Sequence, residues 1–109
     1  MSRRDPRLTR LRDLADMIQT RELGRIAALN AACQQTEARI ADLRAPTPWS
    51  DDPALFRARQ AHLLWAQTES TRLMQRLALQ KARLEEQKSK TARALGRSDV
   101  LARLAKVRR

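Results

Sequence analysis

The chain has 109 residues, of which 42% are hydrophobic and 3% aromatic, so a single domain over 1–109 with few bulky core side chains is expected. Two glycines, four prolines and no tyrosine leave little of the turn and strand chemistry that a sheet needs. The formal net charge of +11 suits nucleic acid, an anionic membrane or an acidic protein surface, and by itself selects none of them. The composition therefore favours an all-α fold.

The cysteine content and the hydropathy pattern bear on location. Cys33 is the single cysteine, which excludes an internal disulfide and favours a reducing compartment. No apolar run of signal-peptide length follows the basic first twelve residues. No stretch approaches the ~20 apolar residues of a membrane-spanning helix. We expect a cytoplasmic protein that is soluble or peripheral to a membrane.

The first helix is predicted over residues 6–44. Asp5 is a candidate N-cap, and Pro6 suits the first helical position. Within this helix, steps of three and four residues give the repeat of a coiled-coil seam at Ile26, Leu29, Cys33, Thr36, Ile40 and Leu43. The repeat is interrupted after Ile18, and Gly24 lowers helix propensity there by about 1 kcal/mol relative to alanine. This region is expected to be the weakest part of the helix.

Pro46 and Pro48 end the first helix and begin a turn over residues 45–52. A new capping signal follows, since Pro53 suits the first position of a second helix and is preceded by Ser50, Asp51 and Asp52. The second helix is predicted over 53–95, with Gly96 as its C-terminal cap. Ser98 could cap a short third helix over 98–107, whose apolar stripe would be Val100, Leu101, Leu104 and Val107.

The second helix carries a seam that matches the first. It repeats every seven residues at Phe56, Leu63, Ser70, Leu77, Leu84 and Thr91, with Ala66, Leu73 and Ala94 three places after members of that series. The predicted fold is an antiparallel two-helix coiled-coil hairpin. Closure near Trp49 would pair residues whose numbers sum to about 99, such as Leu43 with Phe56, Glu22 with Leu77 and Ala15 with Leu84. Pairing between chains is the alternative, so the oligomeric state stays open.

Catalytic and metal-binding constellations are not found in the sequence. One histidine, His62, and one cysteine cannot supply the three or four protein ligands of a zinc site. Two glycines cannot form a phosphate-binding loop or a dinucleotide fingerprint. His62 is therefore interpreted as a surface or seam residue. We expect no enzyme activity and no cofactor.

Two groups of residues are candidates for partner binding. Basic side chains gather near both termini, and the candidates among them are Arg7, Arg10, Arg97, Arg103, Lys106 and Arg108. The aromatic candidates, Phe56 and Trp65, follow the turn, and aromatic side chains often anchor interfaces. A basic helical protein could bind nucleic acid nonspecifically, but no aromatic residue is interspersed in the basic run and no reading motif occurs.

The chain resembles the FliJ family of flagellar export proteins and their injectisome counterparts, which are small, basic, cytoplasmic two-helix coiled coils. The resemblance covers nearly the whole chain and lies in the layout more than in a motif. It rests on the leucine and arginine-glutamate pattern of residues 7–23, the tract 38–44, the tryptophan-bearing second helix and the basic, leucine-spaced tract 94–106. The chain is shorter than typical members, and its turn is rich in proline.

The resemblance implies a non-catalytic stalk or chaperone of a flagellar or type III protein export apparatus. Members of the family stand in the centre of the export ATPase ring and also contact the export gate and substrate chaperones. The paired basic ends of this chain would then enter the ring, and the turn end would face other partners. A generic coiled-coil adaptor anchored by Phe56 and Trp65, and a nonspecific nucleic-acid binder, are the alternatives.

Overall fold

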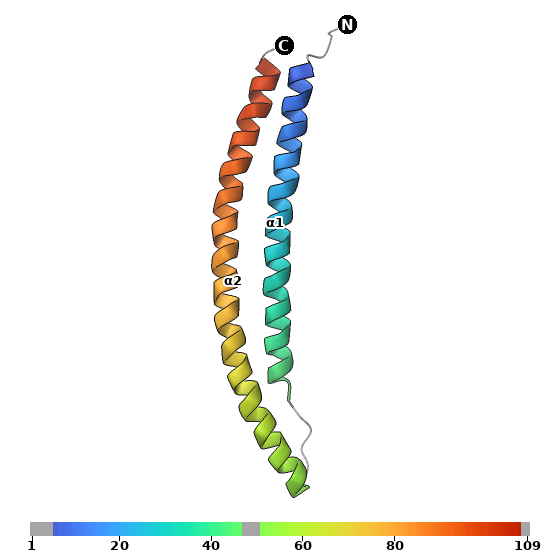
Figure 1. Ribbon diagram of the computed structural model, residues 1–109, viewed down its shortest axis with the longest axis vertical. Coiled ribbons are helices and arrows are strands. Elements are labelled where there is room, and N and C mark those ends of the chain that lie inside the picture. The colour runs from blue at the N-terminus through green and yellow to red at the C-terminus, as the bar shows by residue number, and fades with distance from the viewer. Residues whose placement is uncertain (1–5, 47–50, 108–109) are drawn as a thin grey trace. The chain divides into compact units, whose positions relative to one another are not determined.

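Two long α-helices form an all-α helical hairpin in the computed structural model, which describes residues 6–46 and 51–107 (Figure 1). Helix α1 spans Pro6–Arg44 and has 39 residues. Helix α2 spans Pro53–Val107 and has 55 residues. The predicted fold class and the predicted bounds of the first helix are confirmed. No helix of the described segments combines the length and the apolar character required to cross a membrane.

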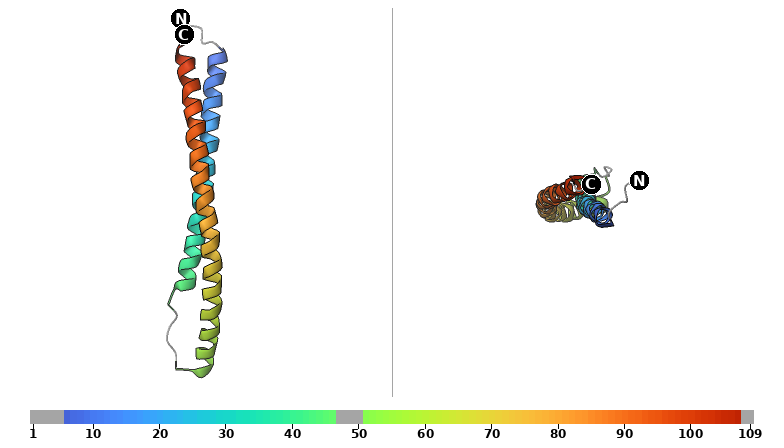
Figure 2. Two further views of the ribbon diagram at one scale, coloured as in Figure 1. Left: turned by 90° about the vertical axis from the view of Figure 1, so that its left-hand side faces the viewer. Right: turned by 90° about the horizontal axis from the view of Figure 1, so that it is seen from above.

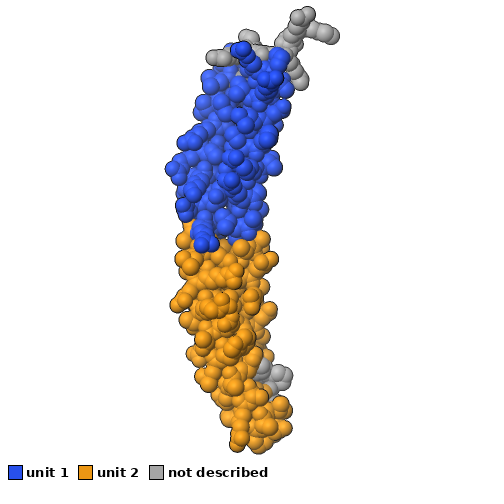
Figure 3. All heavy atoms as spheres, viewed as in Figure 1, with its two compact units in different colours: residues 1–29, 83–109 blue, residues 30–82 orange. Residues whose placement is uncertain are grey.

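The chain divides into two compact units (Figure 3). The terminal unit consists of residues 1–29 and 83–109, and the central unit consists of residues 30–82. Within each unit a segment of α1 runs antiparallel beside a segment of α2 (Figures 1 and 2). Each unit therefore has its own stretch of seam.

Capping explains why α2 begins at Pro53. The Asp52 carboxylate accepts a hydrogen bond of 3.0 Å from the backbone N–H of Ala54, and the Asp52 carbonyl oxygen accepts one of 2.9 Å from the backbone N–H of Phe56. Asp52 is thus the N-cap, and Pro53 occupies the first helical position, where no N–H is needed. The predicted caps Asp5 and Ser50 lie outside the described residues.

The predicted break at Gly96 is wrong, because α2 continues through this residue to Val107 and no separate helix over 98–107 exists. No described glycine has a positive φ, so Gly96 does not take the left-handed conformation of a helix cap. The seam continues past it instead: Ser98 is buried, and its hydroxyl donates a hydrogen bond of 3.2 Å to the carbonyl oxygen of Ala15. Packing outweighs the low helix propensity of one glycine.

The predicted seam positions of α1 are confirmed, because each is buried or half-buried. The seam also extends back to the start of α1 through Leu8, Leu11, Ala15, Ile18 and Glu22. In α2 the predicted positions from Ala66 to Ala94 are likewise buried or half-buried, whereas Phe56 and Leu63 are exposed. The seam of α2 therefore begins later than expected.

The predicted register is wrong. In the terminal unit the Ser98 hydroxyl contacts Ala15, and the Thr91 hydroxyl donates a hydrogen bond of 3.3 Å to Glu22, so the paired residue numbers sum to 113 rather than about 99. In the central unit the Thr36 hydroxyl donates one of 2.7 Å to the Gln80 side-chain oxygen, again far from the predicted neighbour Leu63. In the terminal unit the pairing is shifted by fourteen residues, or two heptads, and in the central unit Gln80 lies seventeen residues beyond the predicted neighbour Leu63.

A shift of two heptads keeps every seam residue on the seam, so the periodicity alone cannot distinguish the two registers. The predicted register pairs α1 with α2 from the first residues after the turn, such as Leu43 with Phe56. Eight connecting residues can reach roughly 28 Å, which equals about 18 residues of α-helix rise. The first residues of α2 can therefore extend beyond the end of α1.

The first part of α2 has no counterpart in α1. In the central unit the last seam residue of α1, Leu43, lines one groove with Ser70, and the Arg44 guanidinium lies 3.2 Å from the Met74 sulfur, so residues 53–69 of α2 extend past the end of α1 (Figure 1). Within this stretch Leu55, Phe56, Leu63, Leu64 and Trp65 are exposed. We call residues 53–69 the α2 extension.

Candidate partner-binding surfaces

The terminal unit gathers the predicted basic residues on the beginning of α1 and the end of α2. Arg7 and Arg10 are exposed on α1, and Arg97, Arg103 and Lys106 are exposed on α2. The register places Arg7 at the level of Lys106 and Arg10 at the level of Arg103. The predicted residue Arg108 lies outside the described residues.

Charge is unevenly divided between the two units. The terminal unit has sixteen basic and seven acidic residues in its sequence, whereas the central unit has seven basic and five acidic residues. Most ion pairs within the described part of the terminal unit join exposed neighbours one turn apart, such as Arg103 with Asp99 at 3.0 Å. Such exposed pairs contribute little to stability. The terminal unit therefore offers an anionic partner a strongly basic surface.

A shallow apolar hollow accompanies these basic residues on α2. Its lining residues are Arg93, Gly96, Arg97, Val100 and Leu101. A Cβ added to Gly96 would meet no atom within 4 Å, so the glycine leaves room for an approaching side chain. The sequence pattern predicted a helix end at Gly96 and therefore did not predict a hollow on a continuous helix at this residue. Gly96 and the exposed Val100 are four residues apart and so share one face of α2, which is the feature of the sequence that could have predicted the hollow.

Phe56 and Trp65 are both 54% exposed, but they do not share a face of α2. Nine residues separate them, which amounts to two and a half turns of α-helix, so the two side chains project to opposite sides. The ring of Trp65 contacts that of His62, with centroids 5.6 Å apart. His62 is exposed, as the sequence suggested. Phe56 instead shares its face with Leu63, seven residues later.

A groove lies beside the end of α1 in the central unit. Its lining includes Leu43 and Arg44 of α1 and Leu63, Ser70 and Met74 of α2. The Arg44 guanidinium lies 3.2 Å from the Met74 sulfur. The Ser70 hydroxyl is buried and has no hydrogen-bond partner among the described residues, which is an unfavourable state for a polar atom. The heptad repeat predicted Ser70 on the seam but not the groove, because the groove depends on the register that places the end of α1 beside Ser70 and Met74.

The terminal unit also holds a buried carboxylate in its seam. Glu22 is 4% exposed, and its Oε2 accepts hydrogen bonds from the Gln87 amide at 2.8 Å and the Thr91 hydroxyl at 3.3 Å. Its Oε1 accepts one from Arg25 at 3.3 Å. Gln87 and Thr91 belong to the facing turns of α2, and Arg25 belongs to the next turn of α1. The buried carboxylate therefore has both hydrogen-bond donors and a cation beside it. Glu22 and Thr91 occupied seam positions in the sequence, but their pairing required the correct register.

One exposed ion pair shifts the pKa values of its members. The side-chain hydrogen bond from Arg72 to Glu69 lowers the pKa of the Glu69 carboxyl, and the same bond raises the pKa of Arg72. The Arg72 Nε donates at 3.1 Å. This pair favours the ionised carboxylate, and any stability it adds is present above the ordinary pKa of glutamate and is lost as the pH falls through the lowered pKa. Both residues lie on one turn of α2, so the pair fixes no contact between helices.

Residues with catalytic or metal-binding chemistry are not grouped in the described segments. No set of three or more histidine, cysteine, aspartate or glutamate side chains is placed there to hold a metal ion. Cys33 is buried in the seam of the central unit. His62 contacts an aromatic ring rather than a nucleophile.

Comparison of the chain with protein-family models, with curated proteins and with solved structures finds no match.

Proposed function

We propose that this protein is a non-catalytic coiled-coil component of a flagellar or type III protein export apparatus, a stalk or chaperone that binds the export ATPase ring. The proposal combines the resemblance of the sequence with the charge of the terminal unit. That unit presents exposed arginine and lysine side chains on both helices, while the rest of the chain is nearly balanced in charge. A ring with an acidic inner surface would attract this unit in preference to the central one.

Pull-down by an export ATPase tests the proposal. Reversing two charges of the terminal unit, with Arg103→Glu and Lys106→Glu, should lower the affinity for the ATPase about tenfold or more, a loss of about 1.4 kcal/mol. Both side chains are exposed, so helix content should not change. Raising the salt concentration should weaken binding of the wild type in the same direction.

The matched control is Arg39→Glu with Arg76→Glu, two exposed charges of the central unit. This pair changes the net charge by the same amount, so it should retain wild-type binding if the terminal unit forms the contact. Equal loss in both double variants would mean that net charge alone drives the association. Absence of any binding by the wild type would reject the proposed function.

Nonspecific nucleic-acid binding is the competing function that the same basic surface supports. A gel-shift titration at two salt concentrations separates the two, because phosphate contacts give a steep decrease of affinity with salt for any sequence. A shift with random duplex at low salt, together with no ATPase binding, would favour nucleic acid. The absence of a shift at low salt would end that alternative.

A further inference from the structure

The seam of α2 does not stop where α1 ends. Counting back from the buried residue Ala66 in steps of three and four residues reaches Leu63, Arg59 and Phe56. These three residues therefore continue the line along which α2 packs on α1. We call them the uncovered seam. Phe56 is 54% and Leu63 is 47% exposed, whereas Leu73, further along the same line, is 1% exposed.

The uncovered seam leads into the groove beside the end of α1. Leu63 lines this groove together with Ser70, whose buried hydroxyl has no partner among residues 6–46 and 51–107. A line with exposed apolar side chains that continues a helix-helix interface, and that ends at an unsatisfied polar atom, is suited to contact with another helix. That helix would cover the α2 extension, whose 17 residues amount to roughly 25 Å.

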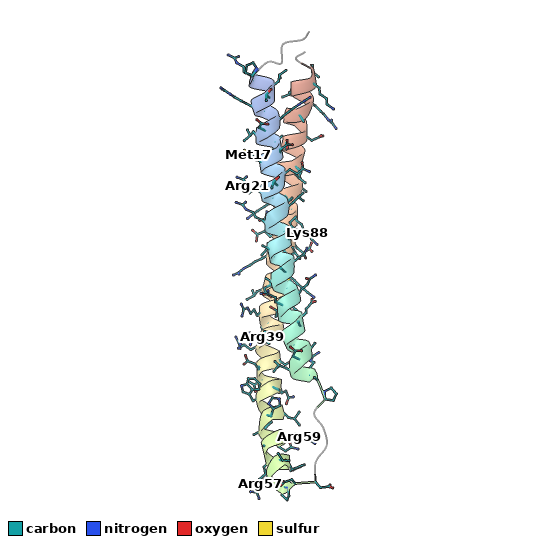
Figure 4. The ribbon with its side chains drawn as sticks, turned by 90° about the vertical axis from the view of Figure 1, so that its right-hand side faces the viewer. Met17, Arg21, Arg39, Arg57, Arg59 and Lys88 are labelled. Atoms are coloured by element: carbon teal, nitrogen blue, oxygen red, sulfur yellow. The ribbon has the colours of Figure 1, made fainter. Side chains whose placement is uncertain are left out.

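Charge decides which kind of helix fits. The only charged side chains from Pro53 to Thr68 are Arg57 and Arg59, and no acidic residue occurs between these limits. Figure 4 labels both arginines on the part of α2 that α1 does not accompany. Arg59 is half-buried on the uncovered seam itself, so a helix lying over it must neutralise the guanidinium. Arg44, at the adjoining end of α1, adds a third positive charge.

A second copy of this chain fits poorly. Antiparallel pairing of two extensions about their midpoint, residue 61, would set the Arg59 side chains of both copies on the shared seam roughly 6 Å apart along it, with no acidic side chain between them. Like charges at the centre of an interface cost several kcal/mol. Asp51 and Asp52 precede the extension and Glu69 ends it, so Arg57 and Arg59 lie between the acidic positions.

We propose that the α2 extension binds an acidic amphipathic helix of another protein, which places apolar side chains against Phe56 and Leu63 and sets a carboxylate against Arg59. This surface belongs to the central unit and is distinct from the basic terminal unit of the proposed function. The partner helix would contact the α2 extension over about two heptads. The two surfaces could bind different partners at once.

A pair of designed helical peptides tests the proposal on the full chain. Both have 21 residues with leucine at two seam positions of each heptad, and they differ only in carrying glutamate or lysine at the flanking positions. Each is labelled with a fluorophore and used at concentrations where it is monomeric. By fluorescence anisotropy the glutamate peptide should bind the wild type at least tenfold more tightly than the lysine peptide.

Variants then locate the contact. Phe56→Ala with Leu63→Ala should weaken the glutamate peptide at least tenfold, and Arg59→Glu should reverse the preference between the two peptides. All three changes are on the α2 extension, so helix content and melting should stay close to wild type. The matched control, Arg76→Glu with Leu79→Ala, alters exposed residues elsewhere in the central unit and should leave peptide binding unchanged.

Several results would overturn the proposal. They are equal binding of both peptides, no binding of the glutamate peptide, or an unchanged preference in Arg59→Glu. Sedimentation equilibrium tests whether a second copy occupies the uncovered seam. If the wild type is a dimer and the double variant Phe56→Ala with Leu63→Ala is a monomer, the uncovered seam is a dimer interface and the proposal is wrong. Binding of the export ATPase is measured separately on the terminal unit, so failure here leaves that proposal intact.

Discussion

The terminal and central units are built from the same two helices, yet they differ in charge and in core. The terminal unit has a net charge of +9 in its sequence, and its buried positions include the polar side chains Glu22, Thr91 and Ser98. The central unit has a net charge of +2, and its buried residues are mainly apolar, with Leu73 the most deeply buried. The surface of the central unit is also where the uncovered seam lies.

This difference shows how a uniform heptad repeat can serve two tasks. Buried apolar side chains supply most of the free energy of packing, and they tolerate more than one register. A buried polar group that finds its partners in only one register costs stability and excludes the others. We therefore expect the central seam to provide most of the stability and the Glu22 cluster of the terminal seam to contribute most to the choice of register, with Thr36 and Gln80 adding one interhelical polar contact in the central unit.

The largest expected effect comes from the central core. Leu73→Ala should lower the free energy of unfolding by about 2–5 kcal/mol, because Leu73 is 1% exposed and the cavity would be enclosed by the facing helix. Urea denaturation followed by circular dichroism measures the change. The comparable substitution in the terminal unit, Leu84→Ala, should cost less, since Leu84 is 8% exposed. A loss below about 1 kcal/mol for Leu73→Ala would mean that the central seam is not the main source of stability.

Removal of the buried carboxylate should have a smaller effect on stability and a distinct effect on register. Glu22→Ala should cost about 1–3 kcal/mol, because the Gln87 amide and the Thr91 hydroxyl lose their acceptor. Glu22→Leu should restore stability, since an apolar side chain suits the seam, but it should relax the register.

Disulfide trapping in a Cys33→Ser background measures that register. Ala15→Cys with Ser98→Cys should form an intramolecular bridge, because these residues contact one another in the observed pairing. Ala15→Cys with Leu84→Cys should bridge only when Glu22→Leu is also present, because that pair belongs to the register shifted by two heptads. Bridging of the second pair without Glu22→Leu would show that the polar cluster does not determine the register.

The smallest effect concerns the two glycines of the terminal unit. Gly24 and Gly96 are exposed in helices, and a Cβ on either would meet no atom within 4 Å. Gly24→Ala and Gly96→Ala should therefore each raise the free energy of unfolding by about 0.5–1 kcal/mol through backbone propensity alone. The matched reverse change, Ala27→Gly at another exposed helical site, should lower it by a similar amount. Destabilisation by either alanine would reveal a contact that requires glycine.

The sequence by itself determined the elements and the faces along which they pack. Composition and periodicity predicted two long helices, with a separate short helix over 98–107 that the structure replaces by a longer α2, and the proline and aspartate signals placed the start of α2 at Pro53 correctly. The heptad repeat identified the seam residues of α1 as far as Leu43. These features are local, since they depend on dihedral preferences and on hydrophobic spacing within one helix.

Only the tertiary structure decided how the seams pair. Registers that differ by whole heptads are equivalent in the periodic pattern, so the contacts of Glu22, Thr91 and Ser98 had to be seen to choose among them. The same choice determines that Phe56 and Leu63 lack a partner helix, and that Gly96 lies within α2 rather than at its end. Interactions between helices, and not local propensity, thus left exposed the residues Phe56 and Leu63, which the sequence pattern had assigned to the seam between the helices.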